Sequence, residues 1–442
     1  MVNTADHITI HPCRALAGSV RVPGDKSISH RVAMLAALAT GTSRLTGFLQ
    51  SEDCRNTLQA IEALGALVES APEFVQVTSR PWECPTHPLD LGNSGTSLRL
   101  LAGLLAARPW TTELTGDASL RSRPMRRIQE PLELMGARVE LAGPDGCAPM
   151  RITGGALRGI EYALPVASAQ VKSCILLAAL FAEGETVIAE PLPTRDHTER
   201  LLQAWGITVR ADGQRITLRG YGPHGPDLEA RDWTVPGDFS SAAFWLVAAA
   251  VLGTSVTVEN TGLNPRRTAL LGVLKRMGAD LTVSVKESDS ALEPSGTITV
   301  HRADLRGAEI GGAEIPNLID ELPIAAVAGA AAKGTTVIRD ARELRFKESD
   351  RISAMVANLR ALGISADERE DGLIVRGGST VRGNVELDCR GDHRIAMALA
   401  ILALRAAAPV GLHGIAGVNT SYPEFWKHLI SLGAHVAFDN RH

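Results

Sequence analysis

The sequence is poor in aromatic residues and contains no long apolar run. Phenylalanine, tryptophan and tyrosine make up 4% of its 442 residues, so its cores must be built mainly from alanine, leucine, valine and isoleucine. The longest apolar runs, such as residues 242–252, are shorter than the roughly 20 residues that span a bilayer. This length argues against a membrane-spanning protein.

Cysteine pairs and a strong net charge are also missing. The six cysteines form no CxxC pair and show no disulfide-like spacing, which is typical of reduced thiols. The first residues lack the cationic start and apolar core of a signal peptide. A net charge of −4 argues against a general nucleic-acid or membrane-surface binder. We therefore expect a soluble cytoplasmic protein with no nucleic-acid or membrane partner.

What the sequence does contain is a sixfold repeat. Glycine follows Leu, Met or Trp at six places where it would supply the left-handed cap of a helix. These glycines are separated by 71, 70, 72, 85 and 70 residues, at Gly65, Gly136, Gly206, Gly278, Gly363 and Gly433. Six polar turns lead, in the same phase, into alanine-rich helices at 22–39, 91–107, 164–182, 235–252, 315–332 and 389–407.

Each repeat reads as strand, helix, strand, helix and two strands, which predicts an α/β fold. The Val-Pro-Gly-Asp turn that opens the first helix recurs at the fourth, so we expect two lobes of three repeats each. We place the first lobe at 21–235 and the second at 236–442 plus 1–20. The chain would then cross between lobes near 18–21 and 235–237, at two adjacent hinges.

Two further segments fit this division. The strand at 8–10 precedes the first repeat and is expected to complete a sheet of the second lobe. The polar run 286–294 is predicted to be a loop, which would explain the one long repeat.

The first helix start has the chemistry of an anion site. Lys26, Ser27 and Arg31 follow a Pro-Gly turn, and either Asp25 or Ser27 can cap the helix. Unpaired backbone N–H groups and the helix dipole favour an anion there. A capped helix with a solvated lysine and arginine is the alternative. The glycine spacing of a Walker phosphate loop is absent.

The other helix starts differ in chemistry. Residues 91–97 expose backbone N–H groups through two glycines, and residues 168–170 offer a hydroxyl and an amide. The turn at 315–323 is acidic, and its Asp320 is either a helix cap or a candidate general base. The second interpretation requires the other turns to hold an anionic substrate opposite Asp320.

Two basic segments also have two interpretations each. In 344–351, Lys347 and Arg351 share a helix face if the helix has begun, and Glu348 lies three residues before Arg351. The alternative is an exposed, salt-bridged helix start. The tract 121–127 offers the same choice between a solvated face and an anion site.

These segments together resemble the EPSP synthase family of enolpyruvyl transferases. The matching motifs run over essentially the whole chain in the family's order: PGDKSISHR at 23–31, LGNSGTS at 91–97, SLRSRPMRR at 119–127, ASAQVKS at 167–173, LIDELP at 318–323, FKESDRI at 346–352 and GDHRIAM at 391–397. The resemblance implies two lobes, each of three βαβαββ units. It also implies transfer of the enolpyruvyl group of phosphoenolpyruvate to the 5-hydroxyl of shikimate 3-phosphate, with release of phosphate, in chorismate and aromatic amino acid biosynthesis.

The resemblance also implies the residues that bind each substrate, and it implies no metal or organic cofactor. We also expect a monomer. For shikimate 3-phosphate the residues are Lys26, Ser27, Arg31, Ser168, Ala169, Gln170, Asp320 and Lys347. For phosphoenolpyruvate they are Lys26, Gly95, Arg123, Gln170, Arg351 and Arg394. The implied catalytic residues are Asp320 as the base at the 5-hydroxyl, Glu348 as the partner at the methylene carbon, and Lys26.

Two departures from the family's pattern bear on these roles, and Gly95 bears on an inhibitor. Ala169 stands where many members have a second serine, so its contact would come from the backbone. Thr420 stands where better-known members place a lysine on phosphoenolpyruvate. Gly95 leaves room for the inhibitor glyphosate, whereas Leu100 and Thr420 differ from sensitive relatives. We expect inhibition that is competitive with phosphoenolpyruvate.

Two other functions compete with this one, and the sequence also predicts a motion of the two lobes. The sister enzyme that acts on UDP-N-acetylglucosamine shares the fold, but its mobile loop usually carries a cysteine that the segment 116–125 lacks. A non-catalytic anion-binding protein would not need both Asp320 and Glu348. The residues implied to bind the substrates are divided between the two lobes. We therefore expect two basic walls, one on each lobe, that repel each other without substrate and close around bound anions.

Overall fold

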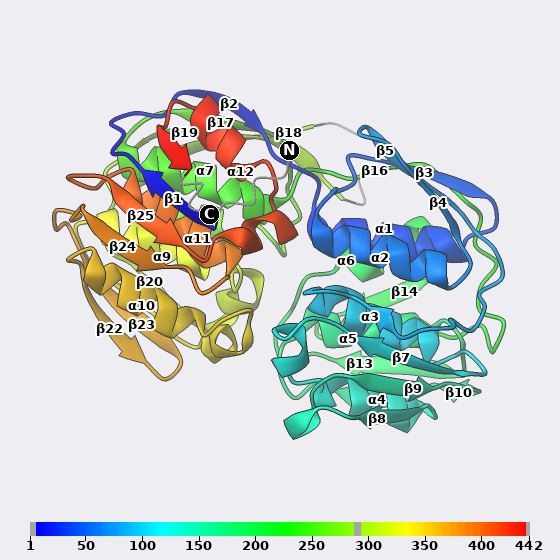
Figure 1. Ribbon diagram of the computed structural model, residues 1–442. Coiled ribbons are helices and arrows are strands. Elements are labelled where there is room, and N and C mark those ends of the chain that lie inside the picture. Colours follow the sequence, from blue (N-terminus) through cyan, green and yellow to red (C-terminus); the bar gives the residue numbers. More distant parts are fainter. Residues whose placement is uncertain (1–5, 287–292, 439–442) are drawn as a thin grey trace. The chain divides into compact units, whose positions relative to one another are not determined.

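A computed structural model of the chain describes residues 6–286 and 293–438. It divides the chain into an N-terminal unit, Gly24–Val235, and a C-terminal unit formed by Met1–Pro23 with Pro236–His442 (Figure 1). The mixed α/β architecture predicted from the sequence is confirmed.

The N-terminal unit contains six α-helices and three four-stranded sheets among its described residues. Its helices are α1 (Lys26–Leu38), α2 (Glu52–Ala63), α3 (Gly95–Leu105), α4 (Arg126–Met135), α5 (Ala169–Ala179) and α6 (His197–Ala204). Its sheets have the orders β16-β3-β5-β4, β6-β7-β9-β8 and β11-β13-β15-β14, and β10 pairs with β12. The strands are β3 (Thr42–Thr46), β4 (Leu67–Ser70), β5 (Phe74–Thr78), β6 (Leu89–Asp90), β7 (Thr111–Thr115), β8 (Arg138–Leu141), β9 (Met150–Thr153), β10 (Leu157–Arg158), β11 (Glu161–Ala163), β12 (Ala182–Glu183), β13 (Glu185–Ala189), β14 (Val209–Asp212), β15 (Arg215–Arg219) and β16 (Trp233–Thr234).

The C-terminal unit repeats this plan in the part that the structure describes. Its helices are α7 (Phe239–Leu252), α8 (Ala269–Arg276), α9 (Leu322–Ala331), α10 (Arg351–Ala361), α11 (His393–Ala403) and α12 (Phe425–Ser431). Its sheets have the orders β18-β19-β17-β2, β20-β21-β23-β22 and β24-β25-β1-β26. The strands are β1 (His7–Ile10), β2 (Gly18–Arg21), β17 (Val256–Gly262), β18 (Ala279–Val285), β19 (Ser295–Ala303), β20 (Glu309–Ile310), β21 (Gly334–Ile338), β22 (Ser365–Arg369), β23 (Gly372–Gly377), β24 (Val385–Asp388), β25 (Val410–His413) and β26 (Val436–Phe438).

All six four-stranded sheets in the described residues follow one topology. The first strand of a repeat runs parallel to the second, as β6 does to β7. The second pairs antiparallel with the fourth, and the fourth with the third, as in β7-β9-β8. The predicted βαβαββ unit therefore describes each repeat.

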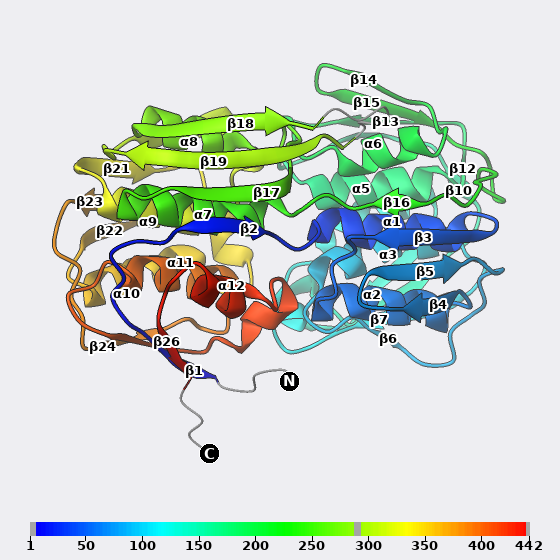
Figure 2. The same ribbon diagram turned by 90° about the horizontal axis from the view of Figure 1, so that it is seen from above.

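The strands at the two crossings are exchanged between the repeats. β2, which precedes α1 in the chain, runs parallel to β17 in the C-terminal unit, and β16, which precedes α7, runs parallel to β3 in the N-terminal unit (Figure 2). The first crossing was expected near 18–21. Gly18–Arg21 is instead a paired strand of the C-terminal unit, and the division follows Pro23.

The N-terminal strand completes the last sheet, as predicted. β1 pairs antiparallel with both β25 and β26, so it serves as the fourth strand of the sixth repeat. The predicted loop at 286–294 falls mostly on residues 287–292, which lie outside the described residues. The strands on either side of it, β18 and β19, pair with each other.

The first helix of each repeat is buried in its own unit. Every residue of α11 is buried, as is all of α7 except Leu252. Small side chains allow these helices to approach closely. At Gly103 in α3, a Cβ atom would lie 2.2 Å from the Cys174 carbonyl oxygen in α5, so only glycine fits there without a shift.

The second helix of each repeat ends at the predicted glycine. All six glycines have φ between 78° and 117°, the left-handed region that side chains disfavour. At Gly136, for example, the N–H donates to the Glu133 carbonyl and closes the end of α4. In residues 6–286 and 293–438, every helix is too short or too polar to cross a membrane.

Candidate active site

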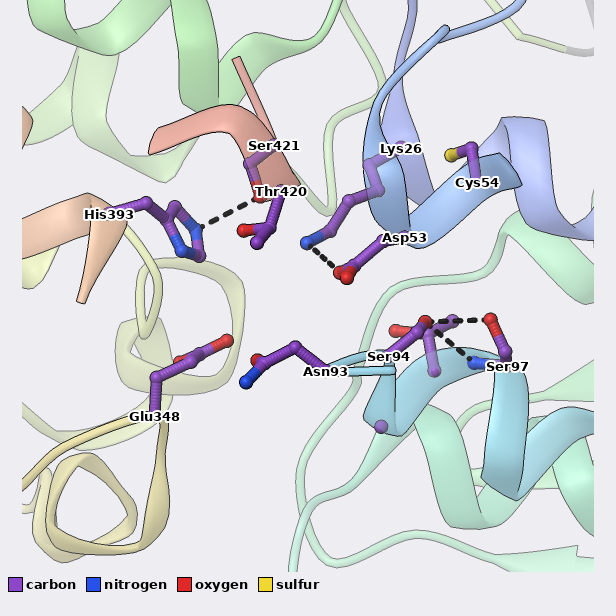
Figure 3. A network of polar contacts seen from close by, with 12 residues as sticks. Lys26, Asp53, Cys54, Asn93, Ser94, Ser97, Glu348, His393, Thr420 and Ser421 are labelled. Atoms are coloured by element: carbon purple, nitrogen blue, oxygen red, sulfur yellow. Dashed lines mark hydrogen bonds and ion pairs between the residues drawn. The ribbon is translucent and has the colours of Figure 1, made fainter. Parts of the chain in front are cut away.

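In the N-terminal unit, the first predicted anion turn is built around Lys26. The Asp25 side chain caps α1 by accepting from the Ile28 N–H at 2.9 Å, which decides between the two predicted caps. Lys26 Nζ donates to Asp53 Oδ2 at 2.7 Å (Figure 3), and Asp53 is 4% exposed in the first turn of α2. Lys26 is therefore held by a buried carboxylate rather than simply solvated.

Arg31 is buried behind this turn. Its guanidinium donates to the hydroxyls of Thr198 and Ser173, each at 2.7 Å, and to the Ser27 carbonyl at 2.9 Å. Thr198 lies in α6 and Ser173 in α5, so three helices fix this cation. The solvated alternative does not hold for Arg31.

Gln170 joins the starts of α3 and α5. Its Oε1 accepts from Arg99 at 2.7 Å, and its Nε2 donates to Thr96 Oγ1 at 2.9 Å. Ser168 caps α5, because its hydroxyl oxygen accepts from the Val171 N–H. A hydroxyl that accepts one hydrogen bond can still donate its own proton to an anion.

Arg123 differs in burial from other arginines of the basic tract 121–127. Its side chain is buried and donates to Asn93 Oδ1 at 2.6 Å and Ser119 Oγ at 3.0 Å, whereas Arg121 and Arg126 are exposed. A Cβ atom on Gly95 would lie 3.3 Å from Arg123 NH1. The glycine at the start of α3 and this buried arginine are therefore neighbours.

In the C-terminal unit, Asp320 lies among three cationic side chains. The carboxylate is 3.6 Å from Lys347 Nζ, 3.5 Å from Arg351 NH1 and 3.8 Å from Arg394 NH2. Opposite charges at these distances favour the ionised carboxylate. The interpretation of Asp320 as only a helix cap is wrong, because α9 begins two residues later and no side-chain cap closes it.

Arg351 is held by two further carboxylates. Its Nε and NH2 approach Asp392 at 2.8 and 3.2 Å, and NH2 also donates to Glu348. Burial alone would lower the pKa of Arg351, but Asp392 and Glu348 outweigh burial and raise this pKa above its ordinary value. The guanidinium is therefore a permanent charge of fixed orientation.

The condition for a shared helix face in this segment is not met. Lys347 does not share a helix face with Arg351, because a short 3-10 helix, Arg342–Phe346, ends just before it and α10 begins at Arg351. The two cations meet at Asp320 through a non-helical turn instead.

The start of α11 supplies the remaining predicted arginine. Arg394 donates from NH1 to the Asp320 carbonyl at 3.0 Å, and the neighbouring His393 ring contacts Ser421 Oγ at 3.1 Å (Figure 3). Thr420 donates to the Gly417 carbonyl at 2.7 Å within its own turn. Position 420 thus provides a hydroxyl and no cation.

The predicted residues thus fall into two groups, one in each unit, which we call half-sites: Lys26, Ser27, Arg31, Gly95, Arg123, Ser168, Ala169 and Gln170 in the N-terminal unit, and Asp320, Lys347, Glu348, Arg351 and Arg394 in the C-terminal unit. Sequence reasoning missed several partners that orient them. Asn93 and Asp392 lie inside the motifs at 91–97 and 391–397, and this position is a local signal for them. Asp53 and Thr198 are 27 and 167 residues from the cations they bind, and no local pattern marks them.

A cavity of the C-terminal unit lies away from the predicted site residues. This cavity, of about 600 Å³, is lined by the ends of α7, α9 and α11, including Val251, Ala331 and Leu404. It contains none of the predicted site residues. Within the described residues, no group of three or more His, Cys, Asp or Glu side chains is placed to hold a metal ion.

Comparison with known proteins identifies the family to which this geometry belongs. The sequence model of EPSP synthase (3-phosphoshikimate 1-carboxyvinyltransferase) matches residues 10–429. The chain belongs to this family. A 3-phosphoshikimate 1-carboxyvinyltransferase of Akkermansia muciniphila is 49% identical over 433 residues, covering 95% of this chain and 98% of the relative. The corresponding protein of Methylococcus capsulatus is 48% identical, with 97% and 98% covered.

A solved structure agrees with this assignment. EPSP synthase from Acinetobacter baumannii superposes with a TM-score of 0.84 at 43% identity, covering 98% of this chain and 99% of that one. The EPSP synthase fold and membership of a transferase family, both expected from the motifs, are confirmed.

Proposed function

We propose that the chain transfers the enolpyruvyl group of phosphoenolpyruvate to the 5-hydroxyl of shikimate 3-phosphate and releases phosphate. The observation that carries this proposal is the Asp320 carboxylate, held 3.5–3.8 Å from three cations in a chain of the EPSP synthase family. A carboxylate that is kept ionised beside a cluster of cations is suited to take a proton from an anionic substrate.

Shikimate 3-phosphate is proposed to bind mainly to the N-terminal half-site. Lys26, Ser27, Arg31 and Ser168 would contact its phosphate, with the backbone of Ala169 in place of a second serine side chain. The burial of Arg31 among hydroxyl groups supports this role, because a guanidinium of fixed orientation binds phosphate with little loss of freedom. Gln170, Lys347 and Asp320 would contact the ring hydroxyls.

Phosphoenolpyruvate is proposed to bind to cations of both half-sites. Lys26, Arg123 and Gln170 contribute from one unit, with the backbone of Gly95, and Arg351 and Arg394 contribute from the other. Its phosphate and carboxylate groups require several cations, and Arg123 and Arg351 are both buried and hydrogen-bonded in place.

The reaction needs one group that takes a proton and one that gives a proton. The 5-hydroxyl oxygen forms a bond to C2 of phosphoenolpyruvate while Asp320 takes the hydroxyl proton and Glu348, in its protonated form, gives a proton to the methylene carbon. Loss of a proton from that carbon then restores the double bond and expels phosphate. Glu348, which Arg351 orients, would handle the proton at the carbon. Lys26, which Asp53 holds, would stabilise the departing phosphate.

A phosphate-release assay with different acceptors tests the substrate. With phosphoenolpyruvate present, we expect release with shikimate 3-phosphate and none with UDP-N-acetylglucosamine or without an acceptor. Release with the nucleotide sugar would favour the sister enzyme. Binding of shikimate 3-phosphate without release would favour a non-catalytic anion-binding protein.

Asp320→Asn tests the proposed base in the same assay. The variant should bind shikimate 3-phosphate with nearly unchanged affinity but turn over about a hundredfold more slowly, because the amide cannot take the proton. Asp367→Asn is the matched control, since Asp367 is exposed and pairs with Arg376 outside the site. A turnover near the wild-type value in Asp320→Asn would sink the base assignment.

A further inference from the structure

A second acidic side chain next to Asp320 has no part in the proposed reaction. Glu321 has a fully buried side chain, and its Oε1 accepts from the Ser240 hydroxyl. The same oxygen lies 3.6 Å from Arg267 NH1 and 3.9 Å from Arg394 NH1. Its Oε2 is also buried and has no hydrogen-bond partner among the described residues.

A buried carboxylate is costly unless cations offset its lost hydration. The positive charge of Arg267 is already balanced by Asp238, whose carboxylate lies 3.2 Å from Arg267 NH2. The same NH2 group donates a hydrogen bond to Ser240 at 2.8 Å. The other cation that Glu321 approaches is Arg394. This arrangement suggests that the carboxylate is retained for its effect on Arg394.

Glu321 belongs to a row of charges that alternate in sign across the helix starts of the C-terminal unit. The row runs from the α7 cap to the turn before α9 and on to α11: Asp238, Arg267, Glu321, Arg394 and Asp320. The first residue of α7 is the buried Phe239, whereas the first residue of α1 is Lys26. The start of α7 therefore provides Asp238 at one end of this row but no cation that could bind a substrate.

We propose that Glu321 is a positioning residue, which holds the Arg394 guanidinium in the orientation that receives phosphoenolpyruvate. Arg394 lies between two carboxylates, with NH1 near Glu321 and NH2 near Asp320. Without the Glu321 charge, the guanidinium is drawn to Asp320 alone and is less available to the substrate anion. Arg351 likewise pairs with a buried carboxylate, Asp392, so each arginine of this half-site lies beside a buried carboxylate.

The inference rests on the proposed function, and kinetics of the full-length chain test it. Glu321→Gln keeps the shape and removes the charge. At saturating shikimate 3-phosphate we expect the KM for phosphoenolpyruvate to rise about tenfold, with the KM for shikimate 3-phosphate within about twofold of wild type. A purely structural role would lower the folded fraction, and hence kcat, without a selective change in either KM.

Glu314→Gln is the matched control, because Glu314 makes a partly exposed pair with Arg276 in the same unit, at 2.8 Å. Its kinetic constants should equal those of wild type. An unchanged KM for phosphoenolpyruvate in Glu321→Gln, or an equal rise in both KM values, would overturn the inference. A wild-type chain that releases no phosphate would instead defeat the proposed function itself.

A milder variant covers the case in which Glu321→Gln does not fold. Ser240→Ala removes the hydroxyl that fixes the Glu321 carboxylate and leaves every charge in place. It should raise the KM for phosphoenolpyruvate in the same direction, by about threefold, again with little effect on shikimate 3-phosphate. Unchanged constants in a folded Ser240→Ala variant would contradict the positioning role.

Discussion

Gly95 is the first residue of α3 and lies beside two arginine side chains. A Cβ atom there would be 2.8 Å from Arg99 NH1 and 3.3 Å from Arg123 NH1. Both contacts are with the ends of flexible side chains, so an added methyl group would displace guanidinium groups rather than backbone. Arg123 is a proposed phosphoenolpyruvate contact, and Gly95 therefore controls the space at that substrate.

We predict that glyphosate inhibits the wild-type chain in competition with phosphoenolpyruvate. Gly95→Ala should raise the concentration for half inhibition about tenfold or more, because one methyl group in a close-fitting site discriminates by about that factor. Gly155→Ala is the control, since a Cβ atom there meets nothing within 4 Å. Full wild-type activity at millimolar glyphosate and limiting phosphoenolpyruvate would refute the prediction.

At the scale of helices, a buried polar chain joins the starts of α1, α2 and α3. The His30 ring contacts Thr57 Oγ1 at 2.7 Å, Thr57 contacts Ser97 Oγ at 2.6 Å, and Ser97 donates to Ser94 Oγ at 2.6 Å. Burial lowers the pKa of His30 well below its ordinary value, and Lys26 and Arg31 lower it further. The helices that carry the half-site thus pack around a neutral histidine.

This histidine should make the free energy of unfolding depend on pH. The unfolded chain binds a proton at His30 below about pH 6.5, while the folded chain resists it, so the unfolded state binds more protons. Stability from this source is complete above pH 6.5 and falls by up to about 1.4 kcal/mol for each pH unit below it, until the lowered folded pKa is reached.

Urea unfolding at pH 7 and pH 5.5 measures the effect. We expect the loss of stability on acidification to be smaller in His30→Gln than in wild type, because the variant lacks the titrating ring. His224→Gln, at an exposed loop position, should behave like wild type. An equal loss in all three proteins would show that His30 does not contribute.

The helices and their ends could be predicted because their signals are local. The alanine-rich runs, the capping turns and the glycines at Gly65 or Gly136 each act within one turn of helix. The exchange of β2 and β16 could not be predicted, because Trp233–Thr234 is a two-residue strand whose partner depends on the path of the whole chain.

The candidate site was predictable where a cation lies in a motif at a helix start, as Lys26 and Arg351 do. Its electrostatic partners were not predictable. Asp53, Thr198 and Glu321 act across packed helices, and their pairing depends on side-chain geometry rather than on spacing in the sequence. A shared helix face for Lys347 and Arg351 depended on where α10 begins, and the sequence did not determine that start.

At the scale of the whole molecule, the residues proposed to bind the two substrates are divided between the two units. The sequence predicted two basic walls, the second including Asp320, that repel each other without substrate. The structure places carboxylates beside many of these cations, among them Asp53 at Lys26 and Asp392 at Arg351, so the repulsion is partly compensated within each unit. A shared ligand, rather than relief of repulsion, would then be the main force that brings the half-sites together.

The central claim is that the two half-sites act on one pair of substrates, and small-angle X-ray scattering tests it most directly. We predict that the radius of gyration falls when shikimate 3-phosphate and a phosphoenolpyruvate analogue are added together, because each ligand then gives both units a common partner. Sulfate at matched ionic strength is the control and should leave the curve unchanged. Identical scattering curves with and without saturating ligands would contradict the account.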